Sequence, residues 1–360
     1  MRTALLVAVG VVASLSAARA QSAAIAGQVL AREGGEPLVS TTISVVSQGT
    51  QTLANESGQF MLRNLPAGEI RLRLKRIGYA PKDTALTIGA SDTVRLRVEM
   101  TRLAIQLPAM VVRGRCTDGE PLEERPAVLA ELFDQVKQNA VQLQLLTRER
   151  PFVLKTIRVR GFRSRDKRVA ATYIDTVLRP AMPTDAYLPR HVLARGEGVE
   201  AGLWFVKLPE LSDFADTAFM NNHCLQYAGQ TLFESDSVIQ VDFEPVPWLN
   251  KDVDIAGSIY LRTFGYQLVA IVMRLNRIPS QFAGIRESSV RARFTEFVTG
   301  VPVLSDWELT NTFRNKSMAP RVEIGQVVDL RWLDSLNVKR DSVPPRPPSP
   351  PLTPPPRAQP

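Results

Sequence analysis

Histidine is scarce in this chain, and the motifs that organise catalysis are missing. Only His191 and His223 occur in 360 residues, and neither begins an H-E-x-x-H or H-x-x-E zinc motif. No G-x-S-x-G nucleophile turn occurs, and neither a P-loop nor a G-x-G-x-x-G loop is found. Asp252 and Asp254 lack the calcium-loop pattern, so we expect solvated loop carboxylates there. We therefore predict that the protein is not an enzyme and holds neither a metal nor a cofactor.

Cysteine is equally scarce, and Cys116 and Cys224 are the only two. A disulfide suits an isolated pair in an oxidising compartment. Metal ligation beside His223 is the alternative, but a C-x-x-C or paired-histidine spacing is missing. We predict a Cys116–Cys224 disulfide. It would close a loop on the order of 100 residues, for which chain entropy sets an upper figure of about 4.7 kcal/mol.

The sequence contains no long apolar run. One short apolar run occurs near the N-terminus. Arg2 precedes an apolar stretch over residues 4–15, and a small-x-small signature follows at residues 18–20. A membrane anchor is the alternative, but the run is shorter than the ~20 residues that cross a bilayer. We predict a signal peptide over residues 1–20, with no transmembrane segment after its cleavage and, since no cysteine follows the cleavage site, no lipid anchor. The protein is then exported to the periplasm or the outer membrane, or secreted.

Acidic side chains do not outnumber basic ones. The sequence has 44 basic and 36 acidic residues, a net charge of +8, which becomes +6 without Arg2 and Arg19. A basic chain suits nucleic acid, but an exported protein does not meet it, so we expect no nucleic-acid partner. An envelope protein or an anionic lipid remains open as a partner.

Basic side chains are most concentrated between residues 148 and 168. They form either the solvated face of a strand with its turn or a patch for anionic lipid head groups or an acidic partner. Ile157 and Val159 would lie on one face of that strand, and the arginines beside them on the other. The predicted patch consists of Arg158, Arg160, Arg163, Arg165, Lys167 and Arg168.

Apolar and polar side chains alternate in several segments of residues 25–100, which predicts short strands. Residues 70–75 and 93–100 alternate strictly between apolar and polar side chains, which is typical of strands with one buried face. Turn clusters at residues 33–37, 55–58 and 65–68 separate such segments. Regular short strands with turns between them predict a β-sandwich.

Several short motifs follow one another in the order of a known family. They are Gly27-x-Val29, Pro37-Leu38, Ser44-Val45, Gly58-x-Phe60, Leu65-Pro66-Ala67-Gly68 and Ile77-Gly78-Tyr79. Together they resemble the carboxypeptidase regulatory-like (transthyretin-like) domain, which also precedes the plug of TonB-dependent receptors. The resemblance implies a β-sandwich over residues 24–103 without the zinc chemistry of a carboxypeptidase. The family usually has Thr-Asp before the Gly-x-Phe turn where this chain has Ala54-Asn55, and Asn can still form the turn hydrogen bond. No plug follows, so we do not expect a receptor.

The pattern changes after residue 103. Residues 104–150 predict a connecting strand and then a helix from Pro126 to about Leu146, because Leu129, Phe133 and Val136 form one apolar stripe. Residues 151–338 predict an antiparallel β-rich domain with hairpins at residues 263–266 and 299–300. The fold class is therefore mainly β: a sandwich, then an α+β domain with the helix packed on a sheet. The second domain is similar in outline to lipoprotein carriers, in which a curved sheet encloses an apolar ligand.

Residues 339–360 are rich in proline and predict an extended, disordered tail. The function that we expect is a non-catalytic binding or assembly module of the cell envelope. A periplasmic carrier or chaperone for an apolar ligand in the C-terminal sheet is one alternative, and a carbohydrate-binding protein, by fold analogy, is another. A ligand-sized apolar cavity under the second sheet would favour the carrier, whereas a filled core with an exposed sheet edge would favour the binding module.

Overall fold

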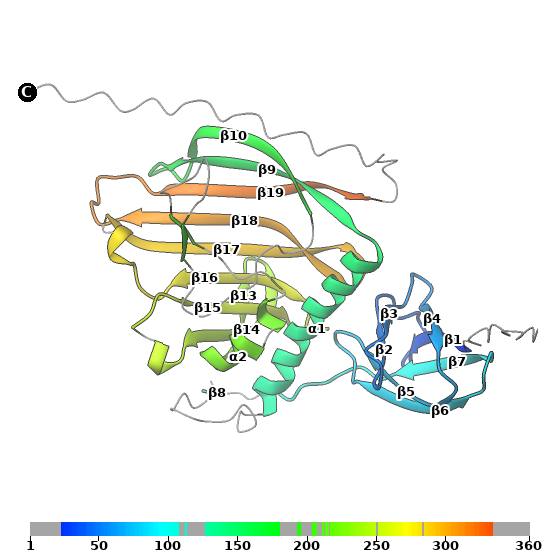
Figure 1. Cartoon of the computed structure of the whole chain (residues 1–360). Coiled ribbons are helices and arrows are strands. Elements are labelled where there is room, and N and C mark those ends of the chain that lie inside the picture. Colours follow the sequence, from blue (N-terminus) through cyan, green and yellow to red (C-terminus); the bar gives the residue numbers. More distant parts are fainter. Residues whose placement is uncertain are drawn as a thin grey trace, which may run out of the picture.

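The computed structural model describes residues 23–107, 112–113, 127–180, 193–195, 204–206, 211, 213–215, 217–249, 251–282 and 284–333. The predicted signal peptide, the proline-rich tail, Cys116 and His191 lie outside the described residues. The chain is mainly β, with a two-sheet sandwich followed by a helix on a ten-stranded antiparallel sheet (Figure 1). This confirms the predicted fold class.

The sandwich is built from two small sheets around a core of its own. One sheet has the order β4 (Gln59–Leu65), β1 (Ala23–Ala31) and β7 (Thr93–Met100), with β1 antiparallel to β4 and parallel to β7. The other has the order β3 (Gln51–Leu53), β2 (Thr42–Val45), β5 (Gly68–Lys75) and β6 (Lys82–Ile88). The alternating apolar side chains of both sheets meet in one cluster, which includes Ile25, Val29, Ile43, Leu62, Leu72, Leu74 and Val98.

The large sheet consists mostly of strands that follow one another along the chain. Both predicted hairpins are present, at residues 263–266 and 299–300. The β9–β10 hairpin joins the sheet through β19, which lies between β9 and β18. The full order is β8 (Val112–Arg113), β13 (His223–Phe233), β14 (Asp236–Pro245), β15 (Ile255–Arg262), β16 (Leu268–Leu275), β17 (Ile285–Val298), β18 (Val301–Phe313), β19 (Arg321–Trp332), β9 (Phe152–Arg163) and β10 (Val169–Pro180). A separate pair is formed by β11 (Leu193–Arg195) and β12 (Trp204–Val206).

Helix α1 (Ala127–Glu149) crosses one face of the large sheet (Figure 1). Its predicted apolar stripe is buried in a cluster with side chains from β13 to β17, from α2 (Thr217–Asn222) and from the short helix η3 (Asp213–Ala215). Phe133 of α1 stacks on Phe219 of α2, with ring centroids 6.3 Å apart. The short helices η4 (Pro247–Leu249) and η5 (Ser280–Phe282) complete the domain. Among the described residues, no helix has the length and apolar character to cross a bilayer.

The opposite side of α1 is also buried, but it is polar and faces the sandwich. Gln135, Gln138 and Gln142 are all buried there. Because buried amides need partners, each of them bonds to the sandwich. The contacts of this polar interface, in order along the helix, are Lys75 Nζ to Asp134 Oδ1 (3.1 Å), Gly78 N to Gln135 Oε1 (2.9 Å), Gln138 Nε2 to Thr42 Oγ1 (3.1 Å), Gln142 Nε2 to Ser40 O (2.8 Å) and Leu53 N to Glu149 Oε1 (3.2 Å).

The loop between β5 and β6 reaches further into the second domain. Ile77, which belongs to the Ile-Gly-Tyr motif of the sandwich, is buried in the core of the second domain instead. Gly78 has φ +79°, and a Cβ atom there would lie 2.9 Å from the Cα of Gly265. The amide of Ile105 donates to the hydroxyl of Tyr266 at 2.9 Å. One motif thus completes the sandwich and also joins it to the second domain.

Candidate functional site

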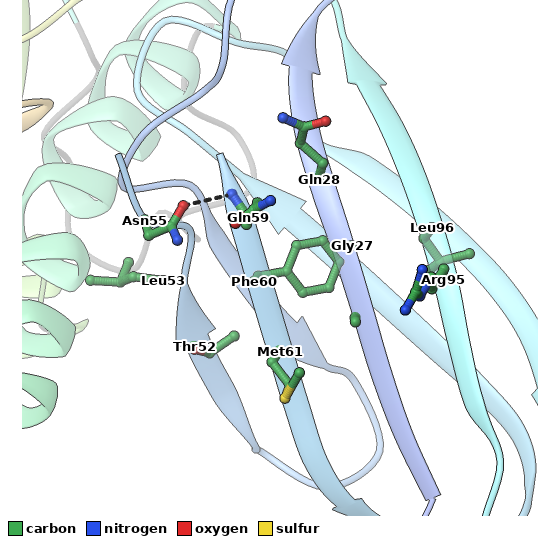
Figure 2. A pocket seen from close by; sticks show the side chains of 11 residues that line it. Gly27, Gln28, Thr52, Leu53, Asn55, Gln59, Phe60, Met61, Arg95 and Leu96 are labelled. Atoms are coloured by element: carbon green, nitrogen blue, oxygen red, sulfur yellow. Dashed lines mark hydrogen bonds between the residues drawn. The ribbon is translucent and has the colours of Figure 1, made fainter. Parts of the chain in front are cut away.

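A hollow of about 670 Å³ opens on the sandwich. Residues of β1, β3, β4 and β7 and of the turn between β3 and β4 surround it (Figure 2). Its lining residues are Ala26, Gly27, Gln28, Thr52, Leu53, Asn55, Gln59, Phe60, Met61, Arg95 and Leu96.

The middle of the hollow is shaped by Phe60 and Gly27. The Phe60 ring lies so close to Gly27 that a Cβ atom on that residue would be 2.5 Å from Cε1 of the ring (Figure 2). Phe60 is only 5% exposed, so it fills the inside of the sandwich and offers no open ring face. The glycine of the Gly-x-Val motif is therefore required by this ring contact.

Carboxamides and one guanidinium form the rim of the hollow. The Oδ1 atom of Asn55 accepts a hydrogen bond from the amide of Gln59 at 2.9 Å (Figure 2). It also accepts one from the amide of Ser57 at 3.0 Å. Gln28 Nε2 donates to the Ser57 carbonyl at 3.0 Å. Asn55 thus makes the turn hydrogen bond that the sequence predicts. Arg95 is exposed and is the only charged residue of the lining, so the rim suits neutral polar groups and negative ones.

Four of the six side chains of the predicted basic patch form ion pairs with carboxylates. Arg158 pairs with Asp175, and its hydrogen bonds hold the pKa of that carboxyl below its usual range. The other three pairs, with their nitrogen–oxygen distances, are Arg160 Nε to Glu323 Oε2 (3.0 Å), Arg163 Nη2 to Glu308 Oε2 (2.7 Å) and Arg168 Nε to Asp166 Oδ2 (3.4 Å). Arg158 and Arg160 pair with carboxylates on the same face of β9 as Phe152 and Leu154, and the Arg160 side chain stays 39% exposed. Binding of an anionic partner by the segment stays a prediction.

Cys224 lies on β13, and the described part of the chain contains no free cysteine. Its predicted partner, Cys116, lies outside the described residues, so their pairing stays a prediction. The register supports it, because β8 pairs with β13 and places Arg113 opposite Gln226. The chain therefore runs beside the strand of Cys224 three residues before Cys116.

His223 and Asp254 are both completely buried. Nδ1 of His223 lies 2.9 Å from the Phe219 carbonyl oxygen, and Nε2 lies 3.2 Å from that of Ile255 and 3.9 Å from Oδ1 of Asp254. The expectation that Asp254 is solvated is therefore wrong, since it accepts a hydrogen bond from the Ile255 amide at 2.9 Å inside the core. Within the described ranges, no three His, Cys, Asp or Glu side chains gather as metal ligands would.

The sandwich also matches a known family. Residues 25–112 match the family described as the CarboxypepD_reg-like domain. The N-terminal sandwich is a CarboxypepD_reg-like domain. The match covers a minority of the chain and extends beyond the predicted boundary at residue 103. None of the curated proteins compared matches this chain.

Several solved structures are similar to parts of this chain at low identity and low TM-score. A putative outer membrane lipoprotein-sorting protein domain from Vibrio parahaemolyticus is 8% identical, with a TM-score of 0.30, over 58% of this chain and 96% of that one. A putative carbohydrate binding protein from Bacteroides uniformis is 10% identical, with a TM-score of 0.20, over 62% and 92%. The minor pilin GBS52 from Streptococcus agalactiae is 17% identical, with a TM-score of 0.21, over 25% of this chain; the chain spans about half, 49%, of that pilin. Likenesses at this level carry no argument about function.

Proposed function

We propose that the protein is a non-catalytic binding module of the cell envelope whose CarboxypepD_reg-like domain receives an extended polypeptide segment of a partner in the hollow. The hollow and its rim carry this proposal. Carboxamides such as Gln59 both donate and accept hydrogen bonds, as peptide groups do. Strand β4 lies at the edge of its sheet, so a peptide can add to it by strand pairing. The envelope location rests on the predicted signal peptide.

The lining favours a peptide over a sugar. Flat sugar rings are held by aromatic faces that are open to the ligand. Phe60 is the only aromatic residue of the lining, and it is buried against Gly27. Met61, which is 43% exposed, instead offers a flexible apolar contact of the kind that adapts to different side chains.

The second domain supports binding rather than carriage of an apolar ligand. In the part of the chain that the structure describes, α1, α2 and η3 cover the inner face of strands β13 to β17. Phe133, Phe214, Phe219 and Phe243 interlock there, with centroids of contacting rings between 4.6 and 6.3 Å apart. A core filled in this way leaves these strands to serve as a rigid support for the sandwich.

A photo-crosslinking amino acid at position 61, used in native cells, tests the proposal. We expect a cross-link to one defined polypeptide. The matched control is the same amino acid at position 82 on β6, where Lys82 is exposed on the other sheet. With the partner purified, Met61→Asp combined with Arg95→Ala should weaken binding by more than about tenfold, and Lys82→Ala should not. Equal cross-links at both positions, glycan or lipid adducts at position 61, or unchanged affinity would contradict the proposal.

A further inference from the structure

The outer face of the β9–β10 hairpin is apolar and exposed. The inner face is identified by Phe152 and Leu154, which cluster with Leu146 of α1. Since side chains alternate along a strand, Lys155, Ile157 and Val159 lie on the outer face. Their register partners on β10, in the same order, are Leu178, Thr176 and Ile174.

Four aliphatic side chains of the hairpin and the neighbouring strand are exposed to solvent. Ile174 is 63% exposed, Leu178 60% and Ile157 37%, and Val328 on the neighbouring strand β19 is 46% exposed. They span three adjacent strands. Aliphatic residues that gather on a surface in this way usually mark a contact site.

The charges of the hairpin are divided between its two faces. The inner face holds the pairs Arg158–Asp175 and Arg160–Glu323. The turn over residues 163–168 keeps positive charge, because four basic side chains meet one acidic residue there and Glu308 of β18 compensates Arg163. Arg165 and Lys167 have no carboxylate partner among the described residues. At the other end of the stripe, Lys155 lies opposite Asp329 of β19 in the register, so its charge is offset there.

We propose that this surface docks the protein on an anionic lipid membrane. We call it the hairpin face and define it as Ile157, Ile174, Leu178 and Val328 together with Arg165 and Lys167. The aliphatic side chains would enter the boundary between head groups and acyl chains, while the cations contact the lipid phosphates. This inference does not depend on the hollow or on its ligand.

Two observations favour a membrane over a protein partner. The apolar members of the hairpin face are Ile, Leu and Val, whereas the anchors of protein interfaces are enriched in Trp, Tyr and Arg. Among the described residues β10 pairs only with β9, and a bulge between Ala171 and Tyr173 interrupts it, where the Thr172 hydroxyl donates to the Arg160 carbonyl at 3.1 Å. A bulge hinders the addition of another strand, so a second copy of the chain is not well accommodated at this edge.

Vesicle sedimentation with the purified full chain tests the inference. We expect binding to phosphatidylcholine vesicles that contain phosphatidylglycerol, little binding to phosphatidylcholine alone, and a steep loss with added salt. Ile174→Ser combined with Leu178→Ser, and separately Arg165→Gln combined with Lys167→Gln, should each weaken the partition by more than about tenfold. Leu232→Ser, which removes a leucine 70% exposed on β13, and Lys82→Gln with Arg97→Gln are the matched controls and should bind as the wild type does.

Three results would overturn the inference. They are equal binding to neutral and anionic vesicles, no vesicle binding by the wild type, or self-association in sedimentation velocity that Ile174→Ser with Leu178→Ser abolishes without any effect on vesicles. If the serine variant fails to fold by circular dichroism, the turn variant still decides the question, because Arg165 and Lys167 are surface residues of a turn.

Discussion

Helix α1 is buried on two sides that have opposite chemistry. Toward the large sheet it presents Leu129, Phe133 and Val136, and toward the sandwich Gln138 and Gln142. Apolar burial has no direction and supplies most of the free energy of folding. Buried amide hydrogen bonds add only about 1 kcal/mol each, but they require a defined geometry. The second domain is therefore held together by apolar burial, whereas the sandwich is oriented by hydrogen bonds to α1 and by the buried side chain of Ile77.

Replacement of Phe133 by Ala should have the largest effect. Phe133 is 4% exposed and stacks on Phe219, so its loss leaves a cavity and should lower the free energy of unfolding by about 3–5 kcal/mol. Urea unfolding of the full chain measures this. Lys137→Ala, at an exposed position of the same helix, should change the free energy by no more than about 0.5 kcal/mol. A cost for Phe133→Ala as small as that of the control would show that burial on this side is not decisive.

Loss of the predicted disulfide should have the second largest effect on stability. Thiol titration of the unfolded, unreduced protein should find no free thiol, and two free thiols would refute the pairing of Cys116 with Cys224. Reduction should lower the free energy of unfolding of the second domain by about 2–4 kcal/mol. The sandwich should be unaffected, because neither cysteine lies in it.

Loss of the polar interface should have a smaller and more local effect. Gln138→Ala combined with Gln142→Ala leaves the Thr42 hydroxyl and the Ser40 carbonyl without these partners, at a cost of about 1–3 kcal/mol. Hydrogen exchange should speed up around residues 40–42 and stay unchanged in β13 to β17. Gln144→Ala, at an exposed position, is the control. Faster exchange throughout the large sheet would mean that the two sides of α1 are not separable.

The smallest effect should be the pH response of Glu149. Burial raises the pKa of this carboxyl, and the Leu53 amide partly offsets the increase. The folded state then holds the proton more tightly than the unfolded state, so the contribution to stability falls as pH rises from the ordinary pKa of Glu through the raised one. Glu149→Gln keeps an acceptor for Leu53 and should be at least as stable as the wild type at neutral pH. The two should be equal near pH ~3, where Glu is protonated. Lower stability of the variant at neutral pH would contradict this sign.

Local patterns predicted the elements better than their contacts. The alternation in β5 and β7 and the apolar stripe of α1 follow from local periodicity, and the structure confirms both. The motif set likewise predicted the sandwich and the Asn55 turn. The ten-stranded order was not predictable, because the insertion of β19 beside β9 joins segments far apart in the sequence.

Burial of polar side chains is where the sequence was least informative. Gln138 and Gln142 on a helix are ordinarily solvated, and only the docked sandwich makes them core residues. Strand alternation places Arg158 on the same face as Leu154 and Ile157 on the opposite face, and the partner of Arg158, Asp175, comes from β10. Ile77 lies inside a motif of the sandwich yet fills the other core. For the two glutamines and for Ile77, a residue from a distant segment determines whether the side chain is buried, and the local periodicity of the sequence contains no information about that residue. The hollow was also missed, because it depends on how β3 and β4 approach each other.

The most direct test of the account is the behaviour of residues 21–103 by themselves. The sandwich has a core of its own, and we expect its contacts with α1 and the second domain to orient it without being needed for its folding. This fragment should therefore unfold cooperatively and show a β-type circular dichroism spectrum in oxidising and reducing buffer alike. If it is disordered alone and folds only when residues 104–338 are added, the polar interface does more than orient the sandwich, and the two regions form one folding unit.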